Sequence, residues 1–176
     1  MTIEDLLAQM TDALSDSIPS DQMDPVMNEL ASVFTKLKAR ATPCLELMEY
    51  LNDESDWLST NAMGTDKNLI QYSLSVAKEM LDNASDSVTE ESCTLVGLFH
   101  AIGMAKFGDD KLQTVEGEDP EIARMKLGSR SLQILADFTP VEPFEAQAVL
   151  YQCVDEIPVD RIELTDLLTN AIKKCA

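Results

Sequence analysis

Apolar residues recur at spacings of three and four along almost the whole chain, and this periodicity restricts the fold more than any other feature. The strict alternation of apolar and polar residues that marks a half-buried strand is nearly absent. Only six glycines and seven prolines interrupt the 176 residues, so the segments between breaks are long enough for helices. The sequence therefore predicts an all-α protein, a single compact bundle of about seven helices.

Several helix starts carry clear local signals. Thr2 and Asp5 are spaced to cap a first helix, and Pro120 and Pro143 stand where a proline suits the first turn of a later one. Prolines at such positions lose no hydrogen bond, because the first N–H groups of a helix have no partner within it. We expect helices to begin at all three places.

Three further starts are predicted from capping residues. Asp24 precedes Pro25, Asp66 precedes an apolar stripe, and Ser87 and Glu90 have the spacing of a capping box. The stretch behind the capping box is apolar on almost every side, which is typical of a helix buried all round. We therefore expect the central helix of the bundle there.

The chain is strongly acidic, with 32 Asp and Glu against 13 Lys and Arg and a formal net charge of −19. Such a surface repels phosphate backbones, so we expect no direct binding of nucleic acid. No run approaches the roughly 20 apolar residues of a membrane span, and the acidic N-terminus is unlike a secretory signal. The four cysteines are isolated, so reduced thiols are expected. These features predict a soluble, cytoplasmic protein.

Residues 43–155 contain four blocks in a fixed order: LMEYLNDESDWLSTNA, NLIQYSLSV, TLVGLFHAIGMAKFGD and LGSRSLQILADFTPVEPFEAQAVLYQ. Their order and spacing resemble the small HD-domain phosphohydrolase family of phages and bacteria, with a weaker continuation to residue 174. The resemblance implies an HD-like helical domain over residues 41–176. Residues 1–40 would then form an N-terminal helical pair packed on it, within one structural unit.

Members of that family hold a divalent metal with a His, an adjacent His-Asp pair and a late Asp, and the metal activates water. The resemblance implies that this chain has lost most of these ligands. His100–Ala101 replaces the His-Asp pair, and Cys153 is an alternative to Gln152 for one lost His. The vestigial site positions implied by the resemblance are Tyr72, His100, Ala101, Met104, Leu127, Gln152 and Ile172.

One imidazole cannot hold a divalent metal by itself, so we expect no metal, no cofactor and no catalytic residue. The mostly apolar replacements would fill the former site with core and avoid buried polar groups without partners. His100 is the only histidine and lies in an apolar segment. We interpret it as a buried histidine with one hydrogen bond rather than as a ligand.

A polar, glycine-containing segment follows Phe107 and is predicted to form a surface loop. No EF-hand spacing is present, so a solvated acidic loop is favoured over a calcium site. The loop is the first candidate for contact with a basic partner, through Asp109, Asp110, Glu116, Glu118 and Asp119.

Three functions stay open at this point. The preferred hypothesis is a catalytically inactive HD-like protein that binds a protein partner with a basic surface. It could be a phage protein acting on a host factor or an acidic mimic of nucleic acid. The second is a metal-free module that binds a nucleotide or small phosphate ligand, and the third is a residual metal-dependent phosphohydrolase. The charge could also serve only solubility.

Overall fold

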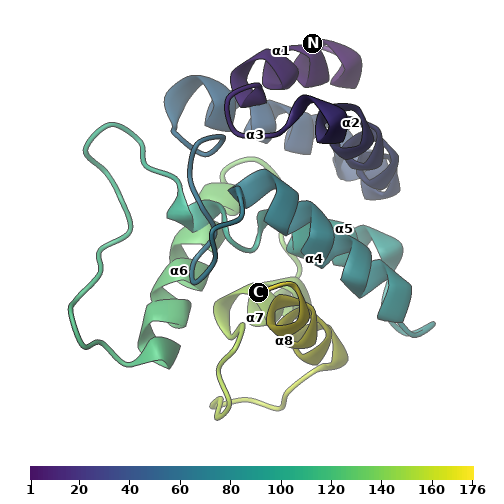
Figure 1. Ribbon diagram of the computed structural model, residues 1–176. Coiled ribbons are helices and arrows are strands. Elements are labelled where there is room, and N and C mark those ends of the chain that lie inside the picture. Colours follow the sequence, from purple (N-terminus) through teal and green to yellow (C-terminus); the bar gives the residue numbers. More distant parts are fainter.

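The computed structural model describes residues 1–176 and contains helices but no sheet (Figure 1). The all-α prediction is confirmed, with eight α-helices where about seven were expected, and with two short 3₁₀ segments. The elements are α1 (Ile3–Leu14), α2 (Ser20–Phe34), η1 (Thr35–Arg40), α3 (Ala41–Glu54), α4 (Leu69–Asn83), α5 (Glu90–Phe99), η2 (Ile102–Met104), α6 (Pro120–Ala136), α7 (Pro143–Leu150) and α8 (Glu163–Cys175).

Helix α5 is the centre of the bundle, as its apolar sequence predicted. Every residue from Ser92 to Phe99 is buried, and α5 packs against α4, α7, α8 and η1. The crossing of α4 and α5 is close because Gly97 has no side chain: a Cβ there would lie 2.5 Å from the Cα of Ala77. No helix is both long enough and apolar enough to cross a bilayer.

The first three helices form one end of the molecule, at the top of Figure 1. Helix α1 contacts α2 and α3, and α2 also contacts α4 and η1. One continuous apolar cluster runs from Leu6 in α1 to Ile172 in α8, so these helices share the core of the remainder. Within η1 the chain kinks at Lys38, whose φ of 53° is positive.

The predicted starts at Thr2, Pro120 and Pro143 are confirmed. Thr2 accepts a hydrogen bond from the backbone N–H of Asp5 while the Asp5 carboxylate accepts one from the backbone N–H of Thr2. Pro120 and Pro143 are the first residues of α6 and α7. In all three cases the signal is contained within one turn of helix.

The other three predicted starts are wrong by a few residues. Helix α2 begins at Ser20 and contains Pro25 in its second turn, so Asp24 caps nothing. Asn68 rather than Asp66 caps α4, because its side chain accepts from the backbone N–H of Ile70. Thr89 caps α5 by accepting from Ser92, while Ser87 instead donates to a carboxylate on α8.

The chain between η2 and α6 is irregular, as predicted. It extends away from the helices at the left of Figure 1 before it returns to the start of α6. A short bridge between Phe107 and Asp110 closes its first turn, with backbone hydrogen bonds of 2.8 and 2.9 Å in the two directions. We refer to residues 107–119 as the acidic loop.

Candidate functional site

His100 ends helix α5 as its C-terminal cap and is fully buried. Its Nδ1 lies 2.8 Å from the carbonyl oxygen of Gly97, so the neutral ring donates its proton there. Burial lowers the pKa of His100 to about 4, although the hydrogen bond to Gly97 opposes this change. The imidazole is therefore neutral at pH 7, which agrees with its interpretation as a buried histidine.

Two other vestigial positions lie beside His100. The ring of Tyr72 stands 5.8 Å from the imidazole, centroid to centroid, and Gln152 donates to the backbone carbonyl of His100 at 3.0 Å. Three buried polar atoms here have no hydrogen-bond partner: the Tyr72 hydroxyl, His100 Nε2 and Gln152 Oε1. The fold thus brings together three residues that are far apart in the sequence.

The remaining vestigial positions carry no polar chemistry. Ala101, Leu127 and Ile172 are buried. Met104 differs, because the 3₁₀ turn of η2 leaves it partly exposed. No three His, Cys, Asp or Glu side chains converge in the chain in a way that could hold a metal ion.

Arg124 lies near the same residues and was not predicted from the sequence. Burial raises the pKa of Tyr72 to about 12, and the nearby Arg124 guanidinium works against that rise. The same cation disfavours protonation of His100. Arg124 forms no ion pair, although the chain has 19 more acidic than basic residues. The one indication in the sequence was that Arg124 lies three residues before the buried Leu127, which places both on one face of the helix.

The acidic loop is partly neutralised by helix α6. Asp110 pairs with Arg130 at 2.9 Å, and Glu118 pairs with Lys126 at 2.8 Å. Asp119 caps α6 by accepting from the backbone N–H of Glu121. Of the five predicted contact residues, only the exposed Asp109 and Glu116 have carboxylates with no partner inside the protein.

A buried ion pair joins η1 to α7 and was also not predicted. Arg40 donates to both carboxylate oxygens of Glu145, at 2.7 and 2.8 Å, and Glu145 has no exposed surface. Ser92 of α5 and the backbone N–H of Glu142 complete its shell at 2.7 and 3.0 Å. Burial raises the pKa of Glu145, but these hydrogen bonds outweigh it and leave the pKa lowered.

Basic residues are absent from the first three helices, although Lys36, Lys38 and Arg40 lie in η1, between α2 and α3. Helices α1, α2 and α3 contain no Lys or Arg, and only one of their carboxylates, Glu29, forms an ion pair, with Lys78 at 2.6 Å. We call the carboxylates of these helices the N-terminal acidic surface: Glu4, Asp5, Asp12, Asp21, Asp24, Glu29, Glu46, Glu49, Asp53 and Glu54.

The fold and these sites define an anionic all-α bundle. No family model matches the chain, and no curated protein or solved structure shows significant similarity to it. The likeness to the HD-domain family therefore stays a prediction from the sequence blocks.

Proposed function

We propose that this protein is a catalytically inactive HD-like protein that acts by binding a protein partner with a basic surface. The observation that carries the proposal is the N-terminal acidic surface, on which nine of the ten carboxylates have no cationic partner. Unpaired surface charge of one sign attracts a patch of the opposite sign and speeds encounter with it.

The segregation of charge supports binding over a purely solubilising role. Solubility requires net charge, but it is served equally well by acidic and basic residues mixed over the surface. Here α1, α2 and α3 contain no basic residue, seven of the 13 basic residues are held in ion pairs, and Lys38 of η1 is the one unpaired basic residue between α2 and α3. A partner that normally binds nucleic acid would present a suitable basic surface, and the chain would then act as an acidic mimic.

The surroundings of His100 support the inactive reading of the former site. Its neighbour Ala101 carries no ligand atom, and the ring is fully buried. The hydrogen bond to Gly97 leaves Nε2 as the one free nitrogen, and no set of three His, Cys, Asp or Glu side chains that could hold a metal ion includes it.

The proposal is tested by capturing partners from extract of the cell in which the protein is made. One variant carries Asp12→Asn, Asp24→Asn and Glu46→Gln, one change on each helix of the N-terminal acidic surface. The control carries Asp155→Asn, Glu156→Gln and Asp160→Asn, three exposed carboxylates outside any ion pair. We expect a protein that the parent and the control retain and the first variant loses. Equal retention by all three would contradict the proposal.

A second function is supported by Arg124. Arg124 has no ion-pair partner, and its guanidinium and the nearby Tyr72 hydroxyl are groups that can donate hydrogen bonds to the oxygens of a small phosphate, whereas His100 Nε2 and Gln152 Oε1 only accept. This metal-free binding of a phosphate ligand is the alternative hypothesis drawn from the sequence. It predicts that inorganic phosphate or a nucleotide raises the midpoint of thermal unfolding in the parent and not in Arg124→Gln. Equal shifts in both proteins would contradict it.

A further inference from the structure

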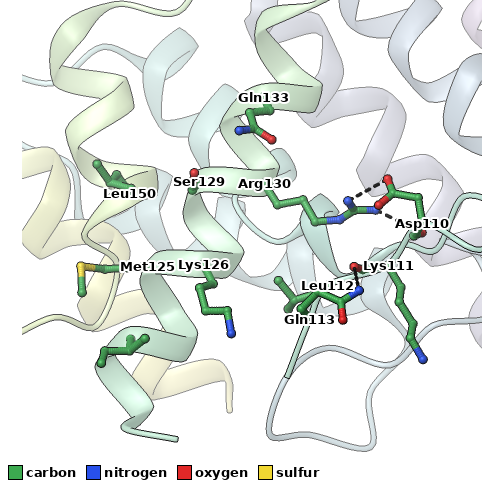
Figure 2. Close-up of a pocket in the computed structure, with 11 residues that line it drawn as sticks. Asp110, Lys111, Leu112, Gln113, Met125, Lys126, Ser129, Arg130, Gln133 and Leu150 are labelled. Carbon is green, nitrogen blue, oxygen red and sulfur yellow. Dashed lines mark hydrogen bonds and ion pairs between the residues drawn. The ribbon is translucent and has the colours of Figure 1, made fainter. Parts of the chain in front are cut away.

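An open cleft of about 550 Å³ lies between the acidic loop and helix α6 (Figure 2). The loop supplies one wall, from Asp110 to Gln113, and α6 supplies the other, from Ile122 to Gln133. Leu150, at the end of α7, contributes to the lining as well. This volume lies within the range of small-molecule sites.

The charge of the cleft is opposite to that of the molecule. Lys111, Lys126 and Arg130 line it together with a single carboxylate, that of Asp110. Lys126 and Arg130 are paired with acidic residues of the loop, but Lys111 is exposed and forms no ion pair. Three of the 13 basic residues of the chain therefore surround one cleft.

Arg130 is bound to the rest of the protein by hydrogen bonds to backbone carbonyls as well as by its ion pair. Arg130 holds the chain just before the loop by donating to the carbonyl oxygens of Gly103 and Ala105, at 3.0 and 3.2 Å. It also donates to the backbone carbonyl of Asp110 at 3.3 Å, and its ion pair with the Asp110 carboxylate joins a guanidinium side chain that is 16% exposed to a carboxylate side chain that is 69% exposed. The exposed Asp110 carboxylate can therefore turn into water and leave its N–H donor on Arg130 to an entering anion, while the bonds of Arg130 to backbone carbonyls stay in place.

The cleft also has an apolar side. Four of its 11 lining residues are hydrophobic, and one of them, Ile122, is 46% exposed. Met125 and Leu150 lie on the side of the cleft away from the guanidinium of Arg130 (Figure 2). A ligand that covered this side would remove apolar surface from water.

We infer that the cleft binds a small organic anion: an apolar or aromatic body with one acidic group, which lies toward Lys111, Lys126 and Arg130. A ligand with several negative charges fits less well, because the net charge of −19 opposes its approach. A neutral ligand would leave Lys111 without an anionic partner. This inference concerns a different surface from the N-terminal acidic surface and does not depend on the proposed partner.

The test uses 1-anilinonaphthalene-8-sulfonate, a fluorescent apolar anion, and the neutral N-phenyl-1-naphthylamine as its uncharged counterpart. We expect saturable binding of the anion by the parent, with chemical-shift changes in its ¹H–¹⁵N spectrum at residues 110–113 and 122–133. Lys111→Gln should weaken binding about threefold, and Lys111→Gln with Lys126→Gln about tenfold. Lys173→Gln, an exposed lysine outside any ion pair, should leave the affinity unchanged.

Three results would overturn the inference. They are binding of the neutral compound as tight as that of the anion, equal affinity in the double variant and the parent, and shift changes that map away from the two walls. Circular dichroism of each variant shows whether it has the parent fold, and Ile122→Ser provides a second test that keeps all charges. We expect Ile122→Ser to weaken binding of the anion, and an unchanged affinity would also overturn the inference.

Discussion

Burial keeps the His100 imidazole neutral, and this makes stability depend on pH. The pKa falls from 6.5 to about 4 on folding, so the unfolded chain binds more protons below pH 6.5. We therefore expect the contribution of His100 to the free energy of unfolding to fall by about 2–3 kcal/mol between pH 7 and pH 4.5. Urea unfolding at the two pH values measures it.

His100→Ala serves as the reference for that measurement. The variant should lose about 1–3 kcal/mol at pH 7, since it removes a buried ring, and should lack the histidine part of the pH dependence. A variant with the same pH dependence as the parent would mean that the pKa of His100 does not change on folding.

Single residues were predictable where burial follows from local sequence. An imidazole inside an almost wholly apolar helix is buried wherever that helix packs, so the environment of His100 could be read from its neighbours. Arg124 could not be placed in this way, because its surroundings come from α4, α5 and the chain after α7. The pairing of Asp110 and Glu118 was missed for the same reason: their partners lie 20 and 8 residues further along the chain.

At the scale of the elements, the Arg40–Glu145 pair fastens η1 to α7. Arg40→Met leaves a buried carboxylate without its cation, and we expect a loss of about 3–5 kcal/mol in the free energy of unfolding. This loss should become smaller as pH falls. Because the pKa of Glu145 is lowered in the folded protein, its ionised carboxylate stabilises the parent at pH values above the ordinary pKa of a glutamate, and this contribution is lost when Glu145 becomes protonated.

Lys36→Met is the matched control for the Arg40 variant. Lys36 lies in the same 3₁₀ segment and pairs with the exposed Glu90 at 2.8 Å, so its loss should be within about 1 kcal/mol. Adding Glu145→Gln to Arg40→Met should recover part of the stability, because it removes the unpaired charge. A double variant as unstable as the single one would show that the cost comes from lost packing.

Helix starts show which element boundaries a sequence specifies. Thr2, Pro120 and Pro143 were sufficient because their effect is confined to one turn. At the starts of α4 and α5 several residues could act as the cap, and tertiary contacts decide which one does. Asn68 is buried and also donates a hydrogen bond to the carbonyl of Leu58, whereas Ser87 donates its hydroxyl proton to Glu163. Such a choice depends on elements that are distant in the sequence.

At the scale of the whole molecule, the account predicts a protein without a stoichiometric transition metal. The fold gathers no three metal-ligating side chains of the usual types, and the one imidazole is buried. Elemental analysis after expression in medium supplemented with Mn, Fe, Zn, Co and Ni should find less than one equivalent of each. One equivalent of a transition metal in the parent that is absent from His100→Ala would contradict the proposal that the protein is catalytically inactive.

The separation of charge also belongs to this scale. The three thirds of the chain contain 12, 11 and 9 carboxylates, so the acidic residues alone appear evenly spread. The basic residues are not evenly spread, because no Lys or Arg occurs before Lys36. The fold then adds α3, which also lacks basic residues, to the same end of the molecule (Figure 1). The sequence alone therefore did not show that these carboxylates form one surface, because this depends on how α1 packs against α3.

The central claim is binding through the N-terminal acidic surface, and the salt dependence of affinity for the captured partner tests it most directly. The dissociation constant is measured between about 0.05 and 0.5 M salt for the parent and for the Asp12→Asn, Asp24→Asn, Glu46→Gln variant. We predict that at low salt the parent binds the partner about tenfold more tightly than the variant does. The affinity of the parent should also fall more steeply than that of the variant as the salt concentration rises. Equal affinity and equal salt dependence in the two proteins would contradict the account.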